Sequence, residues 1–114
     1  MPRAFAVAVG VAASLALACT RRWEPSPPGP PYARVRAVVE RHCIGCHSEH
    51  PTVAAFPIAP QDIRLDTADE IRRYAARIRA TVTVDRTMPL LNKTGMTEEE
   101  RKLVGAWVEA GALR

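Results

Sequence analysis

Aromatic residues are scarce in this chain of 114 residues, which has two Trp, two Tyr and two Phe. Beyond residue 31 the only aromatic residues are Tyr32, Phe56, Tyr74 and Trp107. A chain of this length holds at most one ordinary domain, and a small domain with so few large apolar side chains has a thin core. Length and composition therefore exclude a multidomain enzyme, a polytopic membrane protein, and a collagen-like or fully disordered chain. They also indicate that something besides side chains fills the core.

Charge of one sign is not strongly in excess either, since 16 Lys and Arg against 12 Asp and Glu leave a formal net charge of +4. A nucleic-acid-binding surface usually has a basic stripe with stacking aromatic residues, and the sequence has neither, so we expect no nucleic-acid partner. Four arginines do cluster in one predicted helix, at Arg72, Arg73, Arg77 and Arg79. We interpret them as an exposed helix face, with a binding patch as the less favoured alternative.

The sequence has no apolar run long enough to cross a bilayer, which takes about 20 residues. The longest apolar run spans residues 4–18 and ends in the small-x-small pattern Ala16-Leu17-Ala18. Residues 1–18 therefore predict a signal peptide for export. Cys19 follows directly, in a pattern that resembles a bacterial lipoprotein signal, so we expect lipidation of Cys19; simple cleavage and an uncleaved anchor are the alternatives.

Prolines concentrate after this segment, with five between Trp23 and Pro31. A stretch this rich in proline favours extended polyproline II structure. We interpret residues 19–31 as a Pro-rich tether, with a plain disordered spacer as the alternative. Together with the export signal, the tether predicts a periplasmic protein that is anchored to the membrane as a lipoprotein and carries one domain over residues 32–114.

Three helices are predicted in this domain. The apolar positions of the first recur at i, i+3, i+4 and i+7, at Val35, Val38, Val39 and His42. Capping boxes at residues 67–70 and 97–100 predict two further helix starts. The stripes that follow them are Ile71, Tyr74, Ala75, Ile78 and Val82, and Leu103, Val104, Trp107 and Val108, ending near Gly111. Residues 81–84 alternate but are too short to predict a strand, so the fold class is all-α, with three to four helices.

The first helix leads directly into Cys43-Ile44-Gly45-Cys46-His47, the c-type haem attachment motif. Two thiols three residues apart can add to the two vinyl groups on one edge of a porphyrin, which aims His47 at the iron. Three alternatives compete: a thioredoxin-like redox pair, a zinc site completed by His42 or His50, and a structural disulfide. The first expects a strand before the motif, the second lacks a separate pair of ligands, and the third would enclose only two residues.

A sixth iron ligand must come from elsewhere, and the candidates are His42, His50, Met88, Met96 and the lysines. The two histidines lie too close to the tethered porphyrin edge to cross the ring plane easily. Met88 precedes Pro89, which favours an extended backbone that can lay the sulfur over the iron. Met96 precedes the capping Thr97 and is expected to pack at the helix start, so we favour Met88. Ligation by His and Met raises the reduction potential and suits electron transfer.

A resemblance to a known family rests on the haem motif and on a series of short motifs downstream of it. They are Cys43-Ile44-Gly45-Cys46-His47-Ser48, Pro51-Thr52, Phe56, Ala59-Pro60, Leu65-Asp66-Thr67, Met88-Pro89-Leu90, Asn92, Thr94-Gly95-Met96-Thr97, Glu99-Glu100-Arg101, and Trp107 with Ala110-Gly111-Ala112. Residues 32–114 resemble a class I monohaem cytochrome c, and more narrowly the C-terminal cytochrome c domain of the bacterial membrane-bound urate hydroxylase.

This resemblance implies a small cytochrome c fold packed around one covalent haem c, with Met88 as the axial methionine. An axial imidazole usually donates its other N–H to a carbonyl. In small cytochromes c that carbonyl often belongs to a downstream proline, which Pro60 resembles; otherwise Pro60 only shapes a turn. Leu91 departs from the family, which commonly has Gly there. The membrane domain that carries urate chemistry is not matched, so only the electron-accepting haem module is implied. Trp107 is expected to pack the last helix across the first near Val39.

The sequence thus predicts an exported monohaem cytochrome that carries single electrons between redox partner proteins and is not an enzyme on its own. Cys43 and Cys46 would hold the haem, with His47 and Met88 as iron ligands. One alternative is an electron-accepting subunit of an oxidoreductase complex, for example in purine or urate oxidation. A haem sensor is another, and it would require an exchangeable sixth site. Because the core is thin without haem, we expect the haem-free domain to be largely unfolded.

Overall fold

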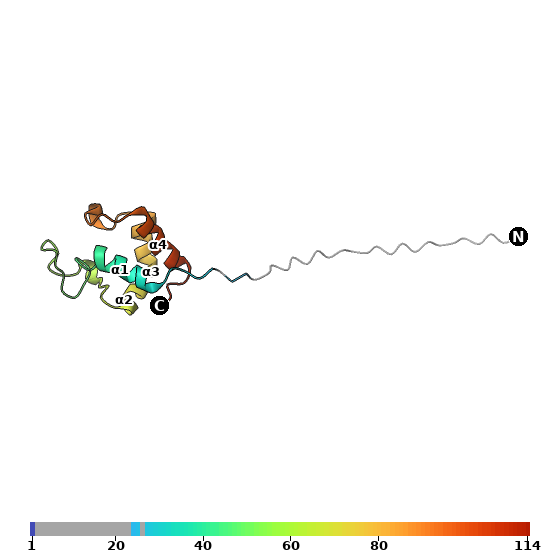
Figure 1. Ribbon diagram of the computed structural model, residues 1–114, viewed down its shortest axis with the longest axis horizontal. Coiled ribbons are helices and arrows are strands. Elements are labelled where there is room, and N and C mark those ends of the chain that lie inside the picture. The colour runs from blue at the N-terminus through green and yellow to red at the C-terminus, as the bar shows by residue number, and fades with distance from the viewer. Residues whose placement is uncertain (2–23, 26) are drawn as a thin grey trace.

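The structure, a computed structural model, describes Met1, residues 24–25 and residues 27–114. The predicted signal peptide 1–18 and the lipidation site Cys19 lie outside the described residues, apart from Met1, as does part of the tether 19–31. The helices are α1 (Tyr32–His42), α2 (Ala68–Arg73), α3 (Ala75–Arg79) and α4 (Glu98–Glu109), and they pack into one unit (Figure 1). The described part of the chain has no strand, so the predicted all-α class is confirmed. None of its helices is long and apolar enough to cross a bilayer.

Helix α1 has the face that its spacing predicts. Val35, Val38, Val39 and His42 are all buried. Pro31 is the residue before the first turn, a position where its missing N–H costs nothing. The helix ends at Cys43, whose N–H donates to the Val39 carbonyl at 2.8 Å. The Cys43-x-x-Cys46-His47 motif therefore begins directly after the last turn of α1.

The single helix predicted after the first capping box is instead divided into three segments. The capping box at Thr67 and Glu70 is present, but α2 ends at Tyr74, whose ψ of 8° is not helical. α3 then leads into a π-helical segment, Ala80–Val84. The Thr81 hydroxyl donates back to the Arg77 carbonyl at 3.0 Å. Such back-bonding and a β-branched run both weaken an α-helix, which explains the widened turn but not the break at Tyr74.

Helix α4 begins and ends where the sequence predicts. Thr97 and Glu100 form the capping box, and Gly111 has a φ of 101°, a conformation that favours glycine. Trp107 is buried, with its ring centroid 6.1 Å from that of Tyr32 on α1, and its Nε1 donates to the Leu113 carbonyl at 2.7 Å. The predicted packing of the last helix against the first is therefore confirmed; the aromatic contact of Trp107 is with Tyr32 at the start of α1, and Val39 lies in the same buried core.

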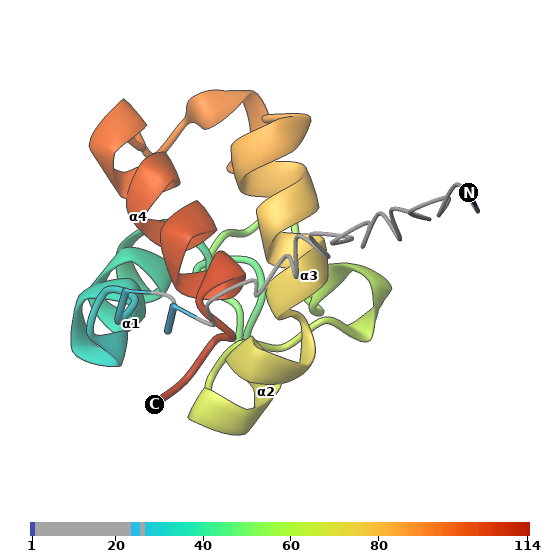
Figure 2. The ribbon, with the colours of Figure 1, turned by 90° about the vertical axis from the view of Figure 1, so that its right-hand side faces the viewer.

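Helix α4 occupies the centre of the arrangement, with α1 on one side and α3 with the π-helical segment on the other (Figure 2). The close approach to the π-helical segment occurs at Gly105, where an added Cβ would lie 3.0 Å from Cγ2 of Thr83. The described end of the tether also packs here, because a Cβ on Gly29 would lie 2.5 Å from Cβ of Ala110. Helix α4 therefore supports the π-helical segment, which contributes Thr81 and Val82 to the cavity described below.

Candidate functional site

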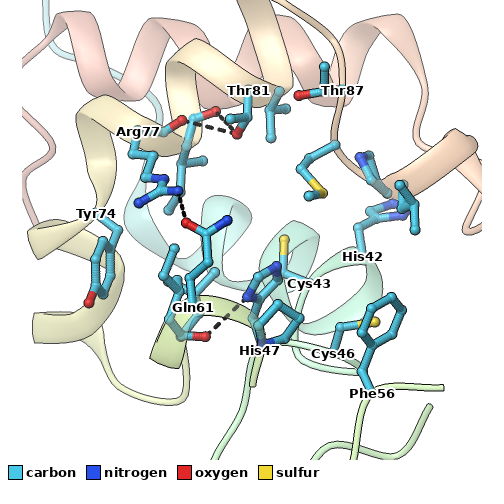
Figure 3. Close-up of a pocket in the computed structure, with 18 residues that line it drawn as sticks. His42, Cys43, Cys46, His47, Phe56, Gln61, Tyr74, Arg77, Thr81 and Thr87 are labelled. Atoms are coloured by element: carbon cyan, nitrogen blue, oxygen red, sulfur yellow. Dashed lines mark hydrogen bonds between the residues drawn. The ribbon is translucent and has the colours of Figure 1, made fainter. Parts of the chain in front are cut away.

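A cavity of about 420 Å³ opens between the turn that follows α1 and the segment that follows the π-helical turn. Its lining is mostly apolar and contains every haem-site residue that the sequence predicts. The lining residues are His42, Cys43, Cys46, His47, Phe56, Pro60, Gln61, Ile63, Leu65, Tyr74, Arg77, Ile78, Thr81, Val82, Thr87, Met88, Pro89 and Leu90. In Figure 3, His47, Cys43 and Cys46 lie on one side of the open centre, with Thr81 and Thr87 on the other.

The two thiols are placed by a short turn at the end of α1. The N–H groups of Cys46 and His47 both donate to the Cys43 carbonyl, at 3.1 and 2.8 Å. Cys43 and Cys46 are free cysteines, so this turn is not closed by a disulfide. Burial, aided by the nearby Cys46, raises the pKa of the Cys43 thiol to about 12. Cys43 is therefore a neutral thiol at neutral pH and not an activated thiolate of the thioredoxin kind.

His47 is oriented by a hydrogen bond to the loop that precedes α2. Its Nδ1 lies 3.1 Å from the Ile63 carbonyl oxygen, and its own carbonyl accepts from Leu65 N–H at 3.0 Å. A carbonyl can only accept, so Nδ1 carries a proton, and in the neutral ring the lone pair is then on Nε2. Among the described residues Nε2 has no hydrogen-bond partner, which leaves it free to bind a metal ion.

The role expected of the Pro60 carbonyl is wrong, because His47 donates to Ile63 instead. Pro60 begins a 3₁₀ turn, Pro60–Asp62, and its carbonyl accepts from Ile63 N–H at 3.2 Å. Pro60 thus shapes the turn that presents the Ile63 carbonyl to His47, which is the alternative that the sequence left open. Pro60 also lines the cavity.

Of the two candidate methionines, only Met88 lines the cavity. Its N–H donates to the Thr81 carbonyl at 3.1 Å, and its own carbonyl accepts from Arg101 Nη1 at 2.8 Å. The peptide bond between Met88 and Pro89 is cis. Met96 is buried in the hydrophobic core instead, and its backbone pairs with the side chain of Asn92. The geometry thus brings Met88, and not Met96, to the same cavity as His47.

The two other histidines are poorly placed as iron ligands. His42 lines the cavity, but its Nδ1 lies 2.8 Å from the Thr94 hydroxyl and its Nε2 lies 3.1 Å from a Glu100 carboxylate oxygen. Both ring nitrogens are therefore engaged, and they connect α1 to the start of α4. His50 is exposed and is not among the lining residues.

Polar side chains reach the cavity mainly from α3 and the 3₁₀ turn. Arg77 is the one cationic side chain in the lining, and it donates to the Gln61 side-chain oxygen (Figure 3). Both of these residues are exposed, so the pair marks the open side of the cavity. An arginine at the mouth of an apolar cavity can pair with the carboxylates of a ligand whose body is apolar.

Arg101 is among the motifs that carry the resemblance, but the sequence alone assigns it no role. It is only 6% exposed, although arginine is almost never buried without partners. A signal was present in the spacing: Arg101, Val104 and Val108 follow i, i+3 and i+7, which places the charge on the apolar stripe of α4. Its guanidinium group donates three hydrogen bonds within residues 82–92, the segment that contains Met88.

Donor clusters of the kind that hold a zinc ion are not present in the described part of the chain, where no three His, Cys, Asp or Glu side chains could share a metal ion. A haem iron needs only two axial ligands from the protein, so this finding affects the zinc alternative alone. The thioredoxin-like alternative lacks its strand within the described residues. Comparisons of the chain with family models, curated proteins and solved structures found no match.

Proposed function

We propose that residues 32–114 form a cytochrome c domain that holds one haem c and carries single electrons. The observation that carries this proposal is the convergence of Cys43, Cys46, His47 and Met88 on one apolar cavity. Three of these residues follow α1, and Met88 lies more than 40 positions later, so their meeting is a property of the fold and not of one short motif.

The cavity fits such a group in size and polarity. A volume of about 420 Å³ is within the range of about 300–1,000 Å³ typical of small-molecule sites. The lining of the cavity is mostly apolar, and its cationic group, Arg77, lies at the open side, as suits a largely apolar occupant with carboxylates at one edge.

Each residue has a definable task toward such a group. Cys43 and Cys46 would fix it covalently by one edge, and His47 would offer the Nε2 lone pair while its Nδ1–H stays on the Ile63 carbonyl. Met88 would offer its thioether sulfur, and Arg77 would pair with a propionate at the open side. When bound by His47 and Met88, a haem would supply reversible one-electron transfer.

An open sixth position, as a haem sensor requires, is disfavoured by the way Met88 is held. Hydrogen bonds fix its backbone on both sides, through Thr81 and Arg101. A subunit that accepts electrons from a separate catalytic chain would use the same site, and a stable partner recovered together with its catalytic activity would support that second function.

For the location of the protein, we propose export to the periplasm and a lipid anchor at Cys19. The support is the apolar run at residues 4–18, which ends next to that cysteine. Cys19→Ala is expected to release the protein from the membrane fraction, and the mature mass of the wild type should include the lipid. Equal membrane retention of both proteins would contradict the anchor.

The experiment that tests electron transfer is a redox titration of the full chain, produced in a periplasm that contains the c-type maturation machinery. We expect one reversible transition of one electron, a c-type α band in the reduced protein and slow binding of CO. Rapid CO binding by the reduced wild type would favour the sensor. Absence of any reversible transition would contradict the carrier function.

A further inference from the structure

The guanidinium group of Arg101 joins three points of the segment that carries Met88. Nη1 donates to the Val82 carbonyl at 2.7 Å and to the Met88 carbonyl at 2.8 Å. Nη2 reaches Oδ1 of Asn92 at 3.3 Å. The segment 82–92 leaves the π-helical turn and passes through Met88, so the three acceptors lie at its start, middle and end.

No carboxylate of the described residues forms an ion pair with Arg101. Burying a cation costs free energy unless hydrogen bonds compensate it, so the main-chain and amide oxygens must serve here in place of an anion. An apolar side chain of similar volume is often tolerated as well as a buried charge. The arginine is therefore better explained by the geometry that it imposes on segment 82–92 than by packing.

The main chain of Met88 is held at both of its polar groups. Its N–H donates to the Thr81 carbonyl, and its carbonyl accepts from Arg101. Thr81 belongs to the π-helical segment, while Arg101 belongs to α4, which is itself tied to the segment by the Thr83 hydroxyl donating to the Arg101 carbonyl at 3.2 Å. With the backbone fixed, only side-chain rotation remains to move the Met88 sulfur.

We propose that Arg101 is the positioning residue for Met88: its guanidinium fork holds the loop so that the thioether stays on the iron and excludes external ligands. The proposal rests on the function proposed above. Loss of the fork leaves covalent attachment through Cys43 and Cys46 intact, because those residues lie on the other side of the cavity. Loss of the fork does, however, let external ligands exchange with Met88 at the sixth coordination position of the iron.

The test compares four full-length proteins matured with haem: wild type, Arg101→Lys, Arg101→Met and Lys102→Met. Arg101→Lys keeps the charge but loses the planar pair of Nη1 and Nη2 donors, and Arg101→Met keeps much of the length but loses both the charge and the donors. Lys102→Met is the matched control, because Lys102 is exposed on the same helix. For each protein one measures covalent haem content, the weak far-red absorption of Met-ligated Fe(III), the midpoint potential and the rate of CO binding to the reduced form.

The expected result is normal covalent haem in all four proteins. Both Arg101 variants lose most of the far-red band, have a lower midpoint potential and bind CO at least about tenfold faster, since about 1.4 kcal/mol of lost positioning corresponds to a factor of ten. Lys102→Met behaves as wild type. If Arg101→Lys and Arg101→Met keep the band and the slow CO binding, the proposal is overturned. A wild type without covalent haem would instead overturn the proposed function.

If neither Arg101 variant accumulates with haem, hydrogen exchange measured by NMR on the wild-type protein tests the proposal instead. The Arg101 guanidinium hydrogens should exchange with solvent at least about tenfold more slowly than those of the exposed Arg73, in keeping with a fully hydrogen-bonded buried group. Exchange that is as fast as that of Arg73 would overturn the proposal.

Discussion

The two walls of the cavity are built in different ways. The His47 wall, residues 43–47, is held by main-chain acceptors of a turn and a loop: the Cys43 carbonyl accepts from two N–H groups of its own turn, and the ring of His47 bonds to the Ile63 carbonyl. The Met88 wall, residues 87–92, is held from α4, by the buried side chain of Arg101. Main-chain hydrogen bonds within a turn and a loop form the first wall, and a side chain from a packed helix completes the second.

This difference predicts that covalent attachment of the haem and ligation of its iron by Met88 respond to different substitutions. The His47 wall would keep the haem in place even if α4 loosened, whereas the Met88 wall would open as soon as α4 moved. Changes in the turn after α1 should therefore abolish the site, and changes in the Met88 wall or α4 should alter the sixth ligand or the stability. The following predictions test that separation, in order of decreasing effect.

The largest effect is expected from His47→Ala, which is compared with the separate single variant Met88→Ala. Without His47 the covalent protein should fail to accumulate, because the imidazole orders the motif and binds the iron. Met88→Ala should keep covalent haem but lose the far-red band and bind CO quickly, as measured by absorption and stopped flow. Met96→Ala, the matched control, should keep the band because Met96 packs in the core. Loss of the band in Met96→Ala but not in Met88→Ala would reverse the assignment.

Trp107→Ala should destabilise the whole domain by about 3–5 kcal/mol, as for other buried tryptophans. The side chain is 2% exposed, faces Tyr32 on α1 and donates to the Leu113 carbonyl. Because α4 carries Arg101, denaturant titration should show the far-red band disappearing before the helical signal at 222 nm. Simultaneous loss of both signals would contradict the view that the Met88 wall depends on α4 in particular.

The two capping boxes allow a matched test of acid stability. Hydrogen bonds from the Thr67 and Thr97 backbones lower the pKa values of Glu70 and Glu100 below the ordinary 4.5, and His42 lowers that of Glu100 further. A depressed pKa stabilises the fold above 4.5 and ceases to do so as pH falls through the lowered value. Glu100→Gln should lower stability by roughly 1 kcal/mol at pH 7, because it removes a charge that accepts hydrogen bonds at the start of α4, and should flatten the acid transition.

Glu70→Gln is the control for that experiment, because Glu70 makes the same cap without a histidine partner. Its effect at pH 7 should be smaller than that of Glu100→Gln. Thermal melts followed by circular dichroism measure the stability effects of both substitutions. They are recorded between pH 3 and 7, a range that includes the titration of ordinary carboxyl groups. Equal effects of the two substitutions would show that the link from α1 to α4 through His42 adds nothing.

The smallest effect concerns Leu91 in the Met88 wall. Leu91 has a φ of 52° and is 80% exposed, so its side chain gains little from burial and is strained by the left-handed backbone. Leu91→Gly should raise the stability by up to about 1 kcal/mol, since left-handed conformations cost other residues roughly 1–2 kcal/mol and glycine loses part of this gain in the unfolded chain. Leu90→Gly should lower it. A destabilising Leu91→Gly would contradict this strain.

The sequence predicted α1, both capping boxes and the residues of the His47 wall because each depends on local spacing. Spacing could not show the break at Tyr74 or the π-helical turn at Thr81, where hydroxyl back-bonding competes with the helix. It also could not show the Ile63 carbonyl, because the choice of acceptor depends on how the 3₁₀ turn at Pro60 is oriented. The role of Arg101 could not be predicted either, because the partners of a charged residue on an apolar stripe are set only when α4 packs.

The measurement that most directly tests the central claim is the mass of the tryptic peptide of residues 42–64 from full-length protein matured in a periplasm with the c-type machinery. This peptide contains Cys43, Cys46 and His47. We predict that it carries the mass of one haem, that acid-acetone extracts no haem from the protein, and that a Cys43→Ser, Cys46→Ser double variant carries none. An unmodified peptide, or haem that is extracted by acid-acetone, would contradict the account.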